Sequence, residues 1–431
     1  MKHQVISKTA AYGCIAALSA GSCAANAQSY WTGPYIGATF GVSSFGTSGV
    51  FDNSDRAVSM GSVTEQGGLA GVHLGYNFDV SDWILGVEAE ISTEDTGARV
   101  TDKVGSVHGL DVDTAFALSG KAGKVYGNTL VYGTAGLAVF NGRLRLADST
   151  TVLGIRDTGV SIGIGSETMV APNLGFYVAG SLTKFDHSVD LNGAFLGDAG
   201  DAFNLVQKVR LDIGVNWYFS GRDSLTFASS KSPVSSAVWN GFHVGGIGAL
   251  GGVNTPGIFD GFGSDADMRS LANPGPGVGV QAGWMQQRGN WVFGITGDVS
   301  QSDWDGAISV DSEGDAHSAT FGRLATVRVR AGKPVGQSLI YGTLGVAALN
   351  GTISVENGTG SASLFSTGYV AGVGIETFVT ENISFTTEGL FLGFNKSHDL
   401  SGLPDGDTGD NIQIANGFQF RAVVNYHFKK K

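Results

Sequence analysis

The sequence predicts an all-β protein that folds as two tandem eight-stranded antiparallel transmembrane β-barrels. Three observations lead to this prediction. The chain repeats itself once, apolar and polar residues alternate with a period of two inside each repeat, and short and long connections follow one another in turn. A period of two separates the two faces of an extended strand. An even number of strands with short turns at one end and long loops at the other is typical of outer-membrane barrels.

The repeat is visible as a series of matched segments in the same order. "WTGPYIGATFG" begins at Trp31 and "WNGFHVGGIGA" begins at Trp239, an offset of 239 − 31 = 208 residues. "LVYGTAG" begins at Leu130 and "LIYGTLG" begins at Leu339, an offset of 339 − 130 = 209 residues. A repeat of this length is a whole domain rather than one module of a solenoid.

The first residues of the chain are typical of a cleaved export signal. Lys2 and Lys8 precede a short apolar run, and Ala-Asn-Ala at 25–27 fits a signal-peptidase site. Both cysteines, Cys14 and Cys23, lie inside this segment. The mature chain is therefore expected to have no disulfide, no thiolate catalysis and no cysteine-bound metal.

These features divide the chain into four segments. A Ser-rich stretch that contains a proline separates the two repeats and is expected to be a periplasmic linker. The predicted segments are the signal peptide 1–27, the first barrel 28–219, the linker 220–238 and the second barrel 239–431.

The alternation places eight strands in each repeat. In the last strand of the first repeat, Leu211 and Trp217 fall on the apolar face, whereas Arg210 and Asn216 fall on the polar face. Apolar faces are expected to contact lipid, and polar faces are expected to line the lumen. The strands of the first repeat are predicted near 32–43, 65–78, 82–93, 113–125, 129–141, 159–171, 174–188 and 204–219.

A soluble β-sandwich also alternates, but two features favour a membrane barrel. The apolar face is unbroken across nearly every strand, and the long-short alternation of loops is regular. In addition, aromatic residues stand at strand ends, where they are expected to form interfacial girdles. These residues are Tyr30, Trp31, Trp83, Trp217 and Trp291.

A single merged barrel of sixteen strands is the alternative fold, and it would enclose a water-filled pore. The sequence favours two barrels because each repeat keeps its own first and last strand and a linker separates them. A pairing of the strand after Trp31 with the strand that ends at Phe428 would indicate the merged barrel.

The matched segments resemble the small eight-stranded outer-membrane barrels of the OmpA-like and opacity-protein type. The surface-antigen barrels of alphaproteobacteria are the most similar group. The resemblance rests on the openings at Trp31 and Trp239, on "WILGVEAEIS", "LVYGTAGLA", "GIGSETMVAPNLGF" and "VNWYF", and on "LIYGTLGVA", "GVGIETFVTENISF" and "VNYHF" in the second repeat. It implies a structural protein of the outer membrane of a Gram-negative bacterium, exported to the envelope, which presents surface loops.

The sequence departs from this family at two points. The family has an acidic residue in the seventh strand, which Glu388 supplies in the second repeat but Ala179 does not in the first. The family ends on an aromatic residue that the barrel-assembly machinery reads, and here three lysines follow Phe428. Phe219 and Phe428 are the candidate assembly signals.

Charged residues on the polar faces are predicted to meet in the lumens. Third-strand acids are expected beside fourth-strand bases, with Glu88 and Glu90 near Lys121, and with Asp298 near Arg328 and Arg330. Charges of opposite sign in a narrow interior should pair, since an unpaired one is costly there. The candidates for lumen ion pairs are Glu88, Glu90, Lys121, Glu167, Lys208, Arg210, Asp212, Asp298, Arg328, Arg330, Glu376, Glu388 and Arg421.

These charges are compatible with two functions. They could form a constriction that selects solutes, or an ion-pair plug that holds each barrel shut. Side chains roughly fill the interior of an eight-stranded barrel, so the plug is favoured. Diffusion of small solutes through a merged barrel is the alternative function.

The sequence gives no indication of catalysis, cofactor or metal. His187 and His398 have Asp190 and Asp399 nearby, but no G-x-S-x-G or H-E-x-x-H element stands in a strand context. Acidic loops do not match the spacing of a calcium site. The net charge of −12, without basic runs inside the chain, argues against nucleic acid. The expected partners are outer-membrane lipid, lipopolysaccharide, the barrel-assembly machinery and an unidentified surface ligand.

Overall fold

The computed structural model describes most of the 431-residue chain. The predicted signal peptide 1–27 and linker 220–238 lie outside the described residues, as do several loop segments. The described ranges are 30–53, 56–60, 66–101, 107–145, 152–190, 202–219, 239–260, 265–268, 274–309, 316–355, 360–403 and 411–428. Among these residues, no helix has the length and hydropathy needed to cross a membrane.

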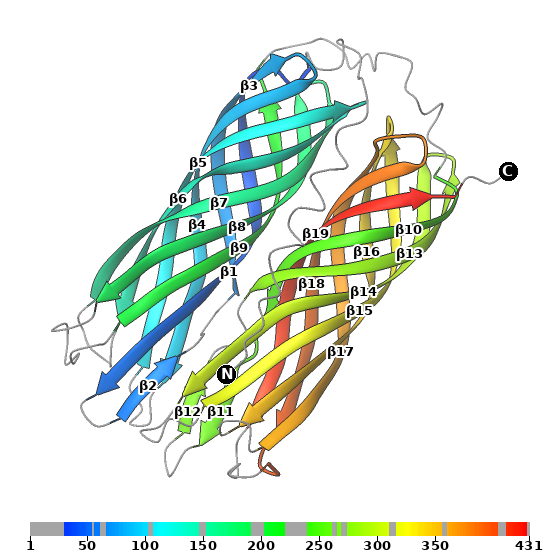
Figure 1. The fold of residues 1–431 in the computed structure, drawn as a ribbon. Coiled ribbons are helices and arrows are strands. Elements are labelled where there is room, and N and C mark those ends of the chain that lie inside the picture. The colour runs from blue at the N-terminus through cyan, green and yellow to red at the C-terminus, as the bar shows by residue number, and fades with distance from the viewer. Residues whose placement is uncertain are drawn as a thin grey trace.

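The described chain is built from nineteen strands, which Figure 1 shows as two tilted groups. In the first repeat they are β1 (Gly33–Asn53), β2 (Arg56–Met60), β3 (Gln66–Val80), β4 (Trp83–Thr101), β5 (Val107–Tyr126), β6 (Thr129–Arg145), β7 (Val152–Ala171), β8 (Leu174–Asp190) and β9 (Ala202–Tyr218). In the second they are β10 (Gly241–Val253), β11 (Gly257–Asp260), β12 (Asp265–Met268), β13 (Gly275–Arg288), β14 (Trp291–Ser309), β15 (Ala316–Val335), β16 (Ser338–Val355), β17 (Gly360–Phe378), β18 (Ile383–Asp399) and β19 (Asn411–His427).

Each repeat closes into its own ring of eight antiparallel strands. β1 pairs with β3, the chain then runs strand by strand to β9, and β9 pairs back with β1, placing Tyr35 opposite Tyr218. In the second repeat β10 pairs with β13 and, at the other edge, with β19, placing His243 opposite His427. The predicted fold of two barrels is thus confirmed, and the merged sixteen-stranded barrel is excluded.

The two ends of each barrel differ in the way that the loop lengths predict. Two-residue turns join β5 to β6 and β15 to β16, and Gly127 and Gly336 adopt a positive φ of 62° in these turns. This left-handed conformation suits glycine because a Cβ would be strained there. At the opposite end the strands run further than the sequence predicts, so that β4 ends at Thr101 rather than near residue 93.

The outer faces of both barrels carry the apolar residues that the period of two assigns to lipid. Phe40 and Leu118 in the first barrel, and Val280 and Val346 in the second, all keep more than 60% of their surface exposed. Exposed aliphatic and aromatic side chains in such number would be unfavourable in water but favourable in lipid. The outward faces therefore define a hydrocarbon-contacting surface.

Trp31 is not part of an interfacial girdle, and that prediction was wrong. Its side chain is 1% exposed and packs edge-on against Tyr218, with ring centroids 5.8 Å apart. Tyr30 packs against the same buried cluster. Trp31 precedes β1, so the alternation of that strand does not fix its direction, and it folds inward near the short-turn end. Trp83, Trp217 and Trp291 are 41–49% exposed, as expected for a girdle.

The two barrels lie side by side with the same orientation (Figure 1). Outward residues of β8 and β9 share a buried apolar cluster with outward residues of β18 and β19. At the long-loop end, one ladder position joins β12 to β4 and two ladder positions join β14 to β2. Part of each surface that the sequence assigns to lipid therefore contacts the other barrel.

The position of Trp31 leads to a stability prediction. Trp31→Ala should lower the free energy of unfolding by about 3–5 kcal/mol, since it leaves a cavity among buried aromatic rings. Trp217→Ala, which removes a half-exposed ring, should cost clearly less. Equilibrium urea unfolding of the protein in lipid vesicles measures both. Equal losses would favour a girdle role for Trp31.

Candidate functional site in the barrel lumens

The lumen of the first barrel contains a cluster around Lys121. The Lys121 Nζ lies 3.0 Å from a Glu88 carboxylate oxygen and donates to the Tyr35 hydroxyl at 2.9 Å. Tyr35 in turn donates to Glu88 at 2.6 Å. The ammonium group also lies over the ring of Tyr132, 4.7 Å from its centroid. One cation is thus surrounded by a carboxylate and two aromatic side chains.

A second cluster of the first barrel is centred on the guanidinium of Arg210. Its Nη2 lies 2.7 Å from Glu90 and 2.9 Å from Asp212. Two residues before Arg210 in β9, Lys208 forms an ion pair with Glu94. All these groups come from β4 and β9, which face each other across the lumen.

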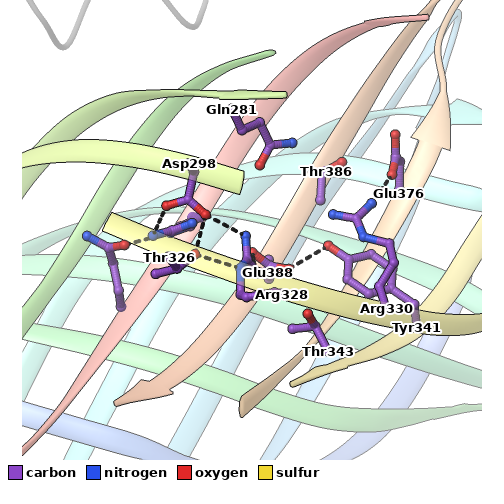
Figure 2. A network of polar contacts seen from close by, with 12 residues as sticks. Gln281, Asp298, Thr326, Arg328, Arg330, Tyr341, Thr343, Glu376, Thr386 and Glu388 are labelled. Atoms are coloured by element: carbon purple, nitrogen blue, oxygen red, sulfur yellow. Dashed lines mark hydrogen bonds and ion pairs between the residues drawn. The ribbon is translucent and has the colours of Figure 1, made fainter. Parts of the chain in front are cut away.

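The lumen of the second barrel contains a more extensive network, shown in Figure 2. Asp298 accepts from Arg328 at 3.1 Å through one oxygen and lies 2.9 Å from Arg421 through the other. The Nη1 of Arg328 lies 2.6 Å from Glu388, and the Tyr341 hydroxyl donates to Glu388 at 2.9 Å. Asp298, Arg328, Arg421 and Glu388 are all at least 94% buried.

Arg330 and Glu376 form a second pair in this lumen, with 2.8 Å between Nη1 and the carboxylate oxygen. The guanidinium stacks over the Tyr341 ring at 4.2 Å from its centroid. The other oxygen of Glu376 accepts from Ser384 at 2.6 Å and lies 3.0 Å from the His427 Nε2. Glu167, at the corresponding position of the first barrel, accepts from the Tyr218 hydroxyl at 3.0 Å.

Strand register determines which of the expected neighbours meet. Glu88 is opposite Ser119 and Lys121 is opposite Gly86, so Lys121 is a diagonal neighbour of Glu88. Glu90 is one step further along β4 and reaches Arg210 instead. Likewise Asp298 is opposite Thr326, diagonal to Arg328, whereas Arg330 is too far along β15 and pairs with Glu376.

Several lumen residues were missed by the sequence analysis. Glu94 was assigned to a loop, but β4 continues past it and its carboxylate binds Lys208. The even positions 88, 90 and 92 already pointed inward, so continuation of the same alternation could have found it. Tyr35 and Tyr341 carry hydrogen bonds in the lumens, but their aromatic rings resemble lipid-facing residues in a one-dimensional pattern. His427 alternates with the apolar face of the last strand, so the period of two does assign it to the lumen.

The two lumens hold different charges at equivalent positions. Arg328 and Glu388 of the second barrel correspond, by the offset of 209, to Ser119 and Ala179 of the first, and Arg421 corresponds to Asp212. Among the lumen residues described above, five acids face three bases in the first barrel, and three acids face three arginines in the second. Each barrel therefore pairs its lumen charges through a different set of residues.

Little open space remains between these side chains in the first barrel. A cavity of about 90 Å³ lies among its lumen residues, next to Glu88, Lys121, Arg210 and Asp212. A water molecule takes about 30 Å³ in the liquid, so this space suits a few waters rather than a solute.

Among the described residues, little supports metal binding or catalysis. No group of three or more His, Cys, Asp or Glu side chains among them is arranged to hold a metal ion. His398 Nε2 lies 3.2 Å from the Ser366 hydroxyl, while Asp399 bonds to Ser401 instead. The side chains of His187 and Asp190 are outside the described set.

The two candidate assembly aromatics end the last strands on the outer face. The backbone N–H of Phe219 donates to the Pro34 carbonyl at 3.1 Å, and that of Phe428 donates to the Phe242 carbonyl at 2.9 Å. Both side chains are half-exposed. Each therefore completes the pairing of a last strand with the first strand of its own ring.

Closed antiparallel rings with apolar outer faces and polar, charged interiors define a transmembrane β-barrel protein. The comparisons with known proteins agree. Residues 14–219 match the family model described as "Outer membrane protein beta-barrel domain". A 22 kDa outer membrane protein of Rhizobium leguminosarum bv. viciae is 32% identical over 174 residues, which are 40% of this chain and 73% of that protein.

The chain belongs to this outer-membrane β-barrel family, and its place is the outer membrane. A 25 kDa outer-membrane immunogenic protein of Brucella canis is 30% identical over 146 residues, 33% of this chain and 65% of that protein. Among solved structures, OprG of Pseudomonas aeruginosa is 11% identical and covers 45% of this chain and all of its own, with a TM-score of 0.33.

The networks predict a non-additive effect in the second barrel. Arg328→Ser alone should lower the free energy of unfolding by about 3–5 kcal/mol, because Glu388 is left buried without its partner. The double variant Arg328→Ser/Glu388→Ala, which installs the residues of the first barrel, should cost less than the sum of the single variants. Unfolding in lipid vesicles tests this, and strict additivity would show that the two residues are not coupled.

Proposed function

We propose that this chain is a structural outer-membrane protein that maintains the envelope and presents surface loops, with both lumens closed by ion-pair networks. The observation that carries the proposal is the charge pairing across each lumen. In the second barrel, Arg328 reaches both Asp298 and Glu388, so its contacts span β14, β15 and β18. A side chain that bridges three strands of a narrow ring occupies the path that a solute would need.

Burial favours a plug over a selective constriction. A selectivity filter exposes its charges to water so that ions exchange with them. Here Arg328, Glu376 and Glu388 are almost fully buried, and each has a partner of opposite charge within 3 Å. Such a pair offers no free charge to a passing ion, and breaking it to admit one would leave an uncompensated buried group.

We propose that the protein catalyses no reaction. The named relatives are outer-membrane proteins, which supports a non-enzymatic role. A serine nucleophile needs a base that is oriented by a third group. The Ser384 hydroxyl lies 2.9 Å from His427 Nε2, but Glu376 contacts this same nitrogen and also accepts from Ser384, so it does not orient the ring through the other nitrogen. The Ser366 hydroxyl contacts His398, but the acid beside this histidine, Asp399, bonds to Ser401.

The proposed partners follow from the surfaces of the barrels. The apolar outer faces suit lipid and the acyl chains of lipopolysaccharide. The aromatic residues Phe219 and Phe428, at the ends of the last strands, would be recognised by the barrel-assembly machinery. The long loops would bind a surface ligand.

Planar-bilayer recording of the refolded mature protein tests the plug. The native protein should be nearly silent, without nanosiemens steps. Arg330→Ala should leave conductance almost unchanged and should lower thermal stability, because Glu376 then loses its cation. Trp217→Ala, on the outer face, is the matched control for handling and refolding.

Large regular steps from the native protein, or a clear change of ion selectivity in Arg330→Ala, would contradict the plug. Either result would instead favour a charged constriction that conducts solutes.

A further inference from the structure

Part of the outer surface of each barrel is covered by the other barrel. On β9, Val209 and Leu211 are fully buried although they alternate with lumen residues and point outward, whereas Val215 is 39% exposed. On β19, the outward-facing Phe418 and Phe420 are buried in the same way. These four side chains belong to one apolar cluster that contains residues of both repeats. We call this contact between the barrels the seam.

In the seam, a large side chain of each barrel (the knob) packs over a glycine of the other barrel (the hole). Phe420 of the second barrel lies over Gly180 of the first, where an added Cβ would be 2.2 Å from the phenyl ring. Leu211 of the first barrel lies over Gly389 of the second, where an added Cβ would be 2.6 Å from the leucine side chain. The offset of 209 relates both members, since 420 − 211 = 209 and 389 − 180 = 209. Each barrel therefore gives the other the same knob position and the same hole.

Hydroxyl groups on the outward faces also meet in the seam. The Thr129 and Ser338 hydroxyls are 2.6 Å apart, and these residues are equivalent to each other because 338 − 129 = 209. A contact between equivalent residues lies on the axis that relates the barrels. The Ser166 and Thr387 hydroxyls are 2.5 Å apart. All four side chains are almost fully buried.

The two-fold symmetry relates the positions of the contacting residues but not their residue types. The positions equivalent to Ser166 and Thr387 are Ile375 and Val178, and both are fully buried members of the seam cluster. The hydrogen-bonded hydroxyls on one side of the axis thus correspond to two apolar side chains on the other side. The seam is a pseudo-two-fold interface.

Contacts at both ends of the barrels give them the same orientation. At the short-turn end, Gly127 lies against Gln337 and Gly336 lies against Asn128, which is again a reciprocal pair. At the long-loop end, the backbone N–H of Gln66 donates to Asn254 at 3.1 Å. The axis therefore runs along the length of the two barrels, which lie side by side in Figure 1.

Small residues and hydrogen-bonded hydroxyls are the features that join membrane proteins in lipid. Burying apolar surface gains little there, so association depends on close packing and on polar contacts. A serine or threonine hydroxyl that faced lipid without a partner would be costly. The glycines at 180 and 389 and the hydroxyls of Ser166 and Thr387 are thus accounted for by a partner surface, whereas lipid does not account for them. Thr129 and Ser338 also bond to Thr168 and Thr377 of their own barrels, so their contact adds to the seam without depending on it.

We propose that the two barrels form one permanent side-by-side unit in the outer membrane, in which each repeat is the specific partner of the other through the seam. An interface of this symmetry uses the same patch on both sides and closes on itself. The seam therefore holds two barrels, does not extend into an array, and does not depend on the linker.

Cysteine pairs in the full chain test the proposal, and the mature sequence has no other cysteine. Ser166→Cys/Thr387→Cys places two thiols where the hydroxyls are 2.5 Å apart. The matched control is Leu137→Cys/Val346→Cys, an equivalent pair (346 − 137 = 209) whose side chains are more than 50% exposed on the outer faces. Both variants carry a protease site in the linker 220–238 and are oxidised in native outer membranes.

After the linker is cut, the seam pair should keep the two halves joined on a non-reducing gel, and the control pair should release them. Release of the halves in the seam variant would overturn the proposal. A cross-link that joins two whole chains before cutting would overturn it as well, because the seam would then form between copies.

Filling the holes gives a second test that needs no cross-link. Gly180→Leu/Gly389→Leu should separate the cut halves during affinity purification through a tag on the second barrel, whereas the native halves should co-purify. Gly133→Leu/Gly342→Leu is the control, since an added Cβ at these equivalent outward positions meets nothing closer than 3.7 Å. Heat-modifiable migration on a gel shows that each barrel is folded. Co-purification of folded Gly180→Leu/Gly389→Leu halves would contradict the seam.

Discussion

Closure of each ring is the constraint on which the rest of the structure depends. In hydrocarbon an unpaired strand edge leaves backbone N–H and C=O groups without partners, so a sheet that crosses the membrane must close on itself. β9 and β19 do this by pairing with the first strands of their own repeats. Phe219 and Phe428 extend this pairing to the membrane edge. Duplication therefore produced a second barrel instead of a wider one.

A ring of eight strands fixes what the interior can contain. Its lumen is so narrow that side chains from opposite strands meet, and charged residues there must find partners. The first barrel uses Arg210 between Glu90 and Asp212, and the second uses Asp298 between Arg328 and Arg421. The sign of the central charge is reversed, yet both arrangements are paired. The geometry of the ring constrains the pairing more strongly than it constrains the individual residues.

Much of this architecture follows from the sequence alone. The period of two assigned residues to faces, and the repeat defined two units, because both depend only on local geometry. Trp31 lay beyond that reach, because it precedes the first strand and no alternation fixes its direction. Glu94 was missed because polar residues there resemble a loop, although the alternation of β4 continues through it. The partner of each lumen charge could be predicted only where strands are neighbours, since register across the ring is not encoded in a single strand.

The outer surface shows a different limit of sequence analysis. The sequence predicts that Leu211 and Phe420 face lipid. Both residues do point outward, but the other barrel covers them. A lipid tail and an apolar barrel wall impose the same pattern on a strand. Only the glycines and hydroxyls among these residues distinguish the two environments, because they suit close packing and hydrogen bonding.

The measurement that tests closure most directly compares two cysteine pairs that share one residue. Ile36 is opposite Trp217 in the first ring, and Tyr426 is the equivalent of Trp217 in the second repeat (426 − 217 = 209). All three side chains are exposed on the outer faces. Two separate barrels predict a disulfide in Ile36→Cys/Trp217→Cys and none in Ile36→Cys/Tyr426→Cys. The opposite result would mean that the first strand pairs with the last strand of the chain, as in one merged barrel, and would contradict the account.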